Sequence, residues 1–159
     1  KNRLMVFLDP NIDPTGAGYT ITQSKIAIGS GGLLGKGWLS WTQNQLNFLP
    51  ERHTDFIFSV VGEEWGYLGC TMLVLLYLFL IIRGMNIAYS TADTSANLLV
   101  VGLVTLLSLQ IFINIGMTMG LMPVVGLPLP LISYGGSSLV CTMAIIALLI
   151  NVRMRRMIF

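Results

Sequence analysis

The chain has 159 residues, of which 54% are hydrophobic and 10% are charged, and its net charge is +2. A composition this apolar is implausible for one water-soluble core and indicates a membrane as the solvent. The positive charges are dispersed and form no stripe along a helix, so the sequence has no electrostatic footprint for nucleic acid.

The first 55 residues are too polar to cross a membrane, yet they carry many Leu, Ile, Phe and Trp side chains. Residues 19–28 mix apolar and polar positions, a pattern compatible with a short helix on the membrane surface and equally with an ordinary loop helix. Trp38 and Trp41 are typical of anchors at the membrane–water interface. We expect residues 1–55 to form a large, structured extracellular loop that includes a membrane-surface helix.

Residues 29–37 form a glycine-rich cluster that invites comparison with phosphate-binding loops. The Walker pattern would need Gly at Ser30 and Ser or Thr at Gly37, and a dinucleotide-binding fingerprint would need Gly at Leu34. Because both patterns fail, the cluster is interpreted as permissive backbone for tight turns.

Three apolar runs, at about residues 56–82, 98–120 and 131–152, are long enough to cross a membrane as helices. Arginines follow two of these runs closely, at positions 83, 153, 155 and 156. Because Lys and Arg are enriched at the cytoplasmic ends of spans, these ends are expected to be cytoplasmic, with residues 1–55 outside. Since no signal peptide precedes an outside start, further helices are expected upstream.

Residues 121–130 contain three prolines but stay apolar, which suggests backbone that dips into a protein-lined cavity. Gln110 and Asn114 are spaced i, i+4 on one face of the preceding span, and they are expected to hydrogen-bond neighbouring helices. The small residues 133–138 open the last span. They fit close helix packing and, equally, backbone N–H groups that bind a diphosphate.

Candidate catalytic chemistry narrows to one carboxylate, Asp55. His53 is the single histidine and no serine has a GxSxG setting, so a Ser-His-Asp hydrolase is poorly supported. The acidic residues show no recognised metal-ligand spacing. Asp55 lies at a loop-to-helix junction, a place suited to taking a proton from a hydroxyl group. A plain helix cap at Thr54 or Asp55 is the alternative, and the residues alone do not separate the two.

Several motifs together cover most of the chain: residues 23–33 (QSKIAIGSGGL), 35–37 (GKG), 49–58 (LPERHTDFIF), 62–64 (GEE), 114–117 (NIGM), 123–130 (PVVGLPLP) and 133–138 (SYGGSS). They resemble the RodA/FtsW/SpoVE (SEDS) family, and residues 42–46 (TQNQL) are closer to its RodA branch than to FtsW. The resemblance implies an all-α multi-pass protein of the bacterial cytoplasmic membrane with about ten helices. This chain would be its carboxy-terminal portion, the large fourth extracellular loop and the last three transmembrane helices.

The resemblance implies a peptidoglycan glycosyltransferase that polymerises lipid II into glycan strands during cell elongation and rod-shape determination, with inversion at the anomeric carbon. The family's essential Asp falls on Asp55, which would deprotonate the acceptor sugar's 4-hydroxyl as general base. The undecaprenyl-diphosphate that leaves would need basic side chains or a divalent cation, Mg or Mn. The implied protein partner is a class B penicillin-binding protein, a single-span transpeptidase.

We expect the substrate to be bound by Lys25, Lys36, Glu51, Arg52, His53, Glu63, Glu64, Ser133, Ser137 and Ser138. Two other functions stay open. One is a lipid II flippase, which would suit intramembrane carboxylates and broken helices. The other is a non-catalytic scaffold of the elongation or division machinery, in which Asp55 is only a helix cap.

Overall fold

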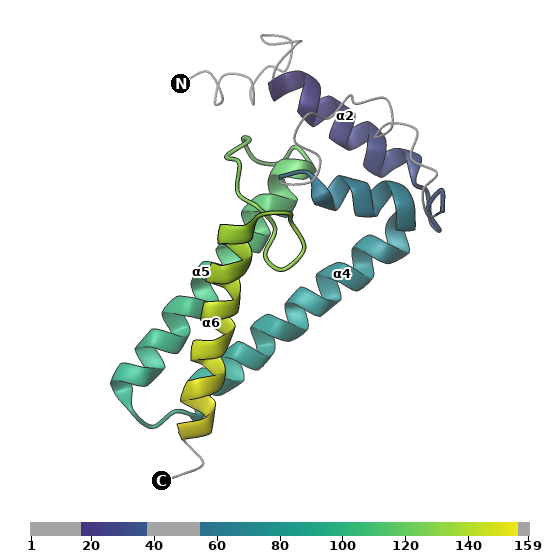
Figure 1. Cartoon of the computed structure of the whole chain (residues 1–159). Coiled ribbons are helices and arrows are strands. Elements are labelled where there is room, and N and C mark those ends of the chain that lie inside the picture. The colour runs from purple at the N-terminus through teal and green to yellow at the C-terminus, as the bar shows by residue number, and fades with distance from the viewer. Residues whose placement is uncertain (1–16, 38–54, 156–159) are drawn as a thin grey trace.

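The structure is a computed structural model that describes residues 17–37 and 55–155 (Figure 1). The helices in these ranges are α2 over Ala17–Ser30, α4 over Ile57–Ser90, α5 over Thr94–Thr118 and α6 over Gly136–Arg155. α4, α5 and α6 are each long and apolar enough to cross a membrane. The predicted fold class, an all-α membrane protein with three spans, is confirmed.

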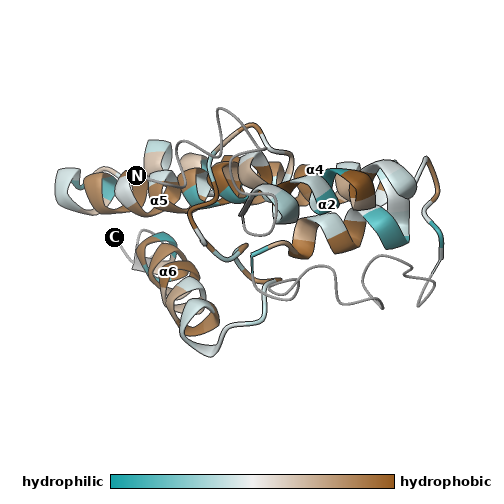
Figure 2. Cartoon of the chain, turned by 90° about the horizontal axis from the view of Figure 1, so that it is seen from above, coloured by the Kyte–Doolittle hydropathy of each residue, from teal (hydrophilic) through white to brown (hydrophobic). Residues whose placement is uncertain are grey.

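α4 and α5 form an antiparallel hairpin, and α6 returns beside them (Figure 1). Close to the turn of this hairpin, Leu149 of α6 packs in an apolar core with Ala88, Val100 and Val104. Gly84 permits the close approach of α4 and α5, because a Cβ there would lie 2.5 Å from Val104 Cγ2. Away from this core α6 diverges from the other two helices, as the view from above shows (Figure 2).

α2 lies across the upper end of this arrangement in Figure 1 and packs on α4 and α5. Its buried side chains Ile21, Ser24 and Ala27 repeat at helical spacing and form one face. Ser24 Oγ donates a hydrogen bond of 2.8 Å to the carbonyl of Thr118 at the end of α5. This contact fixes α2 to the carboxy-terminal end of α5.

α4 is not the straight span expected over residues 56–82. It bends at Gly66, whose φ of 64° and ψ of −158° are not helical. Its first segment runs below α2, across the upper end of the long helices, and the rest of α4 turns downward (Figure 1). Beyond Gly66 it continues to Ser90, because the polar residues after Arg83 are compatible with a helix although they end the apolar run. Hydropathy alone detects neither the bend nor this extension.

α5 begins and ends earlier than the predicted span of residues 98–120. The Asp93 carboxylate caps its start by accepting a hydrogen bond of 3.1 Å from the Ser95 backbone N–H. Its end is closed by Gly120, with φ of 69°, while the Leu121 N–H donates to the Gly116 carbonyl at 2.8 Å. This is the glycine-terminated pattern that satisfies the last carbonyls of many helices.

α6 starts at Gly136, five residues after the expected start of the third span. Leu131 has a φ of 69°, which is incompatible with a helix. The Gly135 carbonyl accepts the first helical hydrogen bond, from Leu139 N–H at 3.0 Å. The apolar residues 131 and 132 therefore belong to the connecting loop, although their hydropathy matches the helix that follows.

Candidate functional site

The bend in α4 is capped on both sides by the glycine-rich loop that follows α2. The N–H groups of Lys36 and Gly37 donate to the carbonyls of Glu63 (3.1 Å) and Glu64 (3.3 Å), which end the first segment of α4. The N–H groups that open the second segment also find partners in this loop, from Tyr67 to the Gly32 carbonyl (2.9 Å) and from Leu68 to that of Leu33 (3.2 Å). Helix ends inside a protein need such partners, so the loop makes the bend possible.

Glycines allow the loop and α4 to approach this closely. A Cβ on Gly31 would lie 1.9 Å from the Gly62 carbonyl oxygen, and one on Gly35 would lie 2.0 Å from that of Glu64. Gly32, Gly35 and Gly37 also have positive φ values of 58°, 79° and 94°. The interpretation of this cluster as turn-forming backbone is confirmed, and its use as a cap for a distant helix is new.

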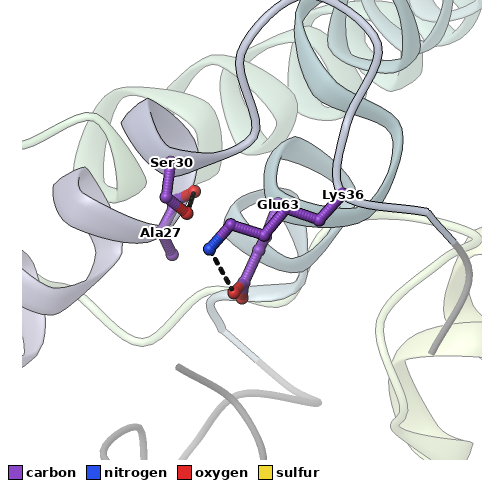
Figure 3. Close-up of polar contacts among 4 residues, drawn as sticks. All are labelled: Ala27, Ser30, Lys36 and Glu63. Carbon is purple, nitrogen blue, oxygen red and sulfur yellow. Dashed lines mark hydrogen bonds and ion pairs between the residues drawn. The ribbon is translucent and has the colours of Figure 1, made fainter. Parts of the chain in front are cut away.

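An ion pair joins the same two elements. Lys36 Nζ lies 3.5 Å from Glu63 Oε1, and the Glu63 side chain is completely buried whereas that of Lys36 is 31% exposed (Figure 3). In the same view Ser30 Oγ donates to the Ala27 carbonyl at 2.9 Å, which closes the last turn of α2. A buried carboxylate needs a compensating charge. Lys36 therefore has a structural role here, as the partner of Glu63, besides any contact with a substrate.

Asp55 lies in the turn just before α4 and is 8% exposed. The N-cap residue of α4 is Phe56, without a side-chain hydrogen bond at the cap, so Asp55 does not occupy the cap position. Its Oδ2 would lie only 3.3 Å from a Cβ on Gly126, whose φ is 78°. The carboxylate therefore lies against the backbone of the proline-rich loop between α5 and α6.

Side chains of α4 and α5 hold that loop through its carbonyl groups. Asn114 Nδ2 donates to Leu127 O at 2.6 Å, and Gln110 Nε2, one turn along α5, donates to Pro128 O at 3.1 Å. Tyr77 of α4 donates to the Pro130 carbonyl at 2.6 Å. The loop thus descends between the helices by about one turn, roughly 6 Å. The sequence predicted that the two amides hydrogen-bond neighbouring helices. This prediction is wrong, because both amides donate to carbonyls of this loop.

Asn114 also joins the loop to the candidate base. Its Nδ2 donates a second hydrogen bond, of 3.0 Å, to the backbone carbonyl of Asp55. The side chain is completely buried, and its Oδ1 has no hydrogen-bond partner among the described residues. One amide thus fixes Asp55 and residue 127 relative to α5. The sequence indicated the helix face of Asn114 but not this role.

We expect Asn114→Ala to lower the free energy of unfolding by about 3 kcal/mol, because the buried Asp55 carbonyl and the part-buried Leu127 carbonyl both lose their donor. Chemical unfolding of the purified protein in detergent measures this change. Asn151→Ala is the matched control, since Asn151 is exposed on α6 and its loss should cost less than about 0.5 kcal/mol. Equal effects of the two substitutions would contradict the assignment.

The other predicted substrate residues lie in different surroundings. Lys25 packs against Gly120, where a Cβ would lie 2.7 Å from Lys25 Nζ, so its charge lies at the carboxy-terminal end of α5. Ser133 Oγ accepts the Leu129 N–H at 2.7 Å and stabilises the loop. Ser137 is exposed and Ser138 half-buried at the start of α6, while Glu64 is half-buried beside Glu63.

Some predictions fall outside the described residues. These are the substrate contacts Glu51, Arg52 and His53 and the interfacial anchors Trp38 and Trp41. Within residues 17–37 and 55–155 no group of three or more His, Cys, Asp or Glu side chains could hold a metal ion. A divalent cation that accompanies the diphosphate stays a prediction.

Sequence reasoning missed Tyr77 and Gly126. Tyr77 is a buried hydroxyl-bearing residue within an otherwise apolar run, which is a usable signal because a tyrosine in that setting needs a hydrogen-bond acceptor. Gly126 lies between prolines, and nothing local indicates that a carboxylate 71 positions earlier packs on it.

The proline-rich loop between α5 and α6, residues 119–135, is called the re-entrant loop below because it descends between the helices. These features define a helical multi-pass membrane protein in which the re-entrant loop lies against a buried carboxylate. A family model described as "Cell cycle protein", FTSW_RODA_SPOVE, matches residues 1–158. The chain therefore belongs to the FtsW/RodA/SpoVE family, which confirms the resemblance. With its three apolar helices, this membership makes it a multi-pass protein of the bacterial inner membrane.

Curated relatives are similar over nearly the whole chain. It is 54% identical over 156 residues to the peptidoglycan glycosyltransferase MrdB of Escherichia coli (strain K12), covering 98% of this chain and 42% of that protein. It is 43% identical to the peptidoglycan glycosyltransferase RodA of Treponema pallidum (strain Nichols), covering 98% of this chain and 36% of that one. The chain thus spans about two fifths of the length of such relatives.

Two solved structures share the fold. One comes from a peptidoglycan synthase complex described as coordinating polymerization and crosslinking, with a TM-score of 0.76, 35% identity and coverage of 98% of this chain and 41% of that one. The other is an aspartate-to-alanine mutant of the rod shape determining protein RodA of Thermus thermophilus, with a TM-score of 0.65, 39% identity and coverage of 84% and 40%.

Proposed function

We propose that the complete protein carrying this chain is a peptidoglycan glycosyltransferase that polymerises lipid II into glycan strands. The observation that carries the proposal is the Asp55 carboxylate, buried against Gly126 of the re-entrant loop and tied to it through Asn114. The names of the relatives, peptidoglycan glycosyltransferases MrdB and RodA, support the same activity.

In the proposed reaction, Asp55 removes the proton from the 4-hydroxyl of the acceptor sugar. The resulting oxygen nucleophile attacks the anomeric carbon of the lipid-linked donor, and the bond from that carbon to undecaprenyl-diphosphate breaks with inversion. The diphosphate leaves as an anion, so it requires positive charge but no general acid. Lys25 and Lys36 are the described basic candidates, and Mg or Mn would assist them.

The direction in the membrane is part of the proposal. α2 and the start of α4, which follows Asp55, lie at one end of the helices (Figure 1), whereas Arg83 and Arg153 belong to the far parts of α4 and α6 and line one cavity there. Arginines favour the cytoplasmic side, so the Asp55 end would face outward, as a polymerase of extracellular glycan requires. A lipid-linked substrate would reach Asp55 from the outer leaflet.

The finer role would be cell elongation and rod-shape determination. Similarity to MrdB and to RodA of Treponema pallidum supports the elongation branch. A division role is the competing assignment, since the chain is also 45% identical to a probable FtsW of Geobacter metallireducens (strain ATCC 53774 / DSM 7210 / GS-15). A class B penicillin-binding protein would be the partner, which agrees with the complex that couples polymerization to crosslinking.

A reconstitution experiment separates this function from its rivals. The complete protein and its class B transpeptidase are placed in liposomes with fluorescent lipid II, and glycan length is measured by gel electrophoresis. We expect polymer that depends on the protein. Lipid II that changes leaflet without polymer would instead show a flippase. If neither polymer nor flipping is detected, the scaffold hypothesis remains.

A further inference from the structure

A small cavity lies between α4 and α6 at the end of the molecule opposite α2. It has a volume of about 100 Å³ and is lined by Arg83, Asn86, Ile87, Ser90, Thr91 and Arg153. One water molecule needs only about 15 Å³ of such space, so the cavity admits a larger polar group. It is remote from Asp55 and plays no part in the proposed glycosyl transfer.

The charge of this cavity is positive. Arg83 comes from α4 and Arg153 from the last turns of α6, and no acidic side chain is among the lining residues. Within the described part of the chain, neither guanidinium forms an ion pair with a carboxylate. Asp93, the nearest acid along the chain, accepts the Ser95 N–H at the start of α5.

The hydroxyl groups of the cavity already donate to backbone carbonyls near the end of α4. Ser90 Oγ donates to the Asn86 carbonyl, and Thr91 Oγ1 donates to that of Ile87 at 2.7 Å. These bonds cover carbonyls that carry the negative end of the helix dipole and would otherwise repel an anion. The side-chain donors left to bind a ligand are the two guanidiniums and the Asn86 amide, which together suit an anion.

The depth of the cavity matches the headgroup layer of a membrane. Arg83 directly follows the apolar run of α4, and its Cζ lies 5.0 Å from the centre of the Phe79 ring. Ser90 lies about 10 Å further along the helix at 1.5 Å per residue. A ligand between these levels lies just beyond the hydrocarbon, where phospholipid phosphates are found.

We propose that this cavity binds the phosphate of an anionic glycerophospholipid, held between Arg83 of α4 and Arg153 of α6. Guanidinium groups bind phosphate through paired hydrogen bonds, and a pair from two helices would clasp one phosphate from both sides. The bound lipid would join α6 to α4 beside the apolar core of Ala88 and Leu149. The opposite end of α6, next to the re-entrant loop, would stay apart from α4 and α5.

The test uses the complete protein in nanodiscs of phosphatidylcholine to which phosphatidylglycerol is added, with bound lipid counted by native mass spectrometry. We expect selective retention of phosphatidylglycerol, and Arg83→Gln and Arg153→Gln should each weaken it at least about tenfold. Arg153→Lys keeps the charge but loses the paired geometry, so it should restore only part of the binding. Lys25→Gln removes one charge at the other end of the molecule; whatever it does to glycosyl transfer, it should leave the retention of phosphatidylglycerol unchanged.

Several outcomes would overturn the proposal. Equal retention of phosphatidylcholine would exclude a site for anionic lipid, and an equal loss in Lys25→Gln would reduce the effect to general surface charge. Millimolar inorganic phosphate that displaces phosphatidylglycerol would identify a site for free phosphate. Thermal melting of each variant in pure phosphatidylcholine checks folding, and a variant that melts as the wild type yet retains phosphatidylglycerol also contradicts the assignment.

Discussion

Asp55→Asn is expected to lower the rate of lipid II polymerisation by the complete protein at least about 100-fold, the usual contribution of a general base. The asparagine amide has nearly the same shape as the carboxylate but cannot accept a proton from the sugar hydroxyl. The contacts with Gly126 and the hydrogen bond from Asn114 to the residue 55 carbonyl should persist. Single-turnover polymerisation of fluorescent lipid II in liposomes measures the rate.

Asp93→Asn is the matched control for this substitution. Asp93 also lies just before a helix, at the opposite end of α4, and it caps α5 through its side chain. Asparagine caps helices as well as aspartate does, so neither stability nor polymerisation should change noticeably. If the Asp55→Asn variant polymerises lipid II at more than about a third of the wild-type rate, Asp55 is not the general base. That result would favour the scaffold or the flippase.

Asp55→Glu separates the need for a carboxylate from the need for its position. The extra methylene moves the charge by about 1.5 Å within a site that is nearly closed to solvent. We expect activity between those of the wild type and Asp55→Asn, since a misplaced base works poorly. Thermal melting of each variant, compared with that of the wild type, shows whether a loss of rate comes with a loss of folding.

The spans could be predicted from the sequence because hydropathy is a local property. The apolar runs near residues 98–120 and 131–152 lie within a few residues of α5 and α6. The errors at their ends come from groups that hydropathy does not weigh, namely the Asp93 cap and the positive φ of Leu131. Helix ends depend on backbone hydrogen bonds, which apolar counts ignore.

The bend at Gly66 could not be predicted in this way. A single glycine inside a helical pattern is usually tolerated, and the groups that stabilise this one lie in residues 31–37. Separation along the sequence likewise hides the pairing of Lys36 with Glu63 and the packing of Gly126 on Asp55. The spacing of Gln110 and Asn114 predicted their shared helix face, which is a local property, but not their partners in the loop after α5.

Gly31→Ala is expected to lower the free energy of unfolding by about 3 kcal/mol, at the upper end of the cost of overpacking. A Cβ at this position would lie 1.9 Å from the Gly62 carbonyl oxygen, which belongs to backbone and cannot rotate away. Loop and helix would have to separate, which would strain the hydrogen bonds that cap the bend. Denaturant unfolding of the complete protein in detergent measures the change.

Gly29→Ala provides the control within the same stretch of chain. Gly29 is in α2, and a Cβ there meets nothing within 4 Å. Alanine favours a helix over glycine by up to about 1 kcal/mol, so this variant should be as stable as the wild type or slightly more stable. If both substitutions destabilise the protein equally, general intolerance of the segment explains the loss and the capping contact does not.

Gly31→Ala and Asp55→Asn should also differ in whether a loss of activity is accompanied by a loss of stability. The loop fixes the first segment of α4 through Glu63 and Glu64, and Asp55 immediately precedes that segment. Gly31→Ala is therefore expected to slow polymerisation about tenfold or more although residue 31 contacts no reacting group, since small misplacements of a catalytic group are costly. A loss of rate with a loss of stability in Gly31→Ala, against a loss of rate alone in Asp55→Asn, would distinguish positioning from proton transfer.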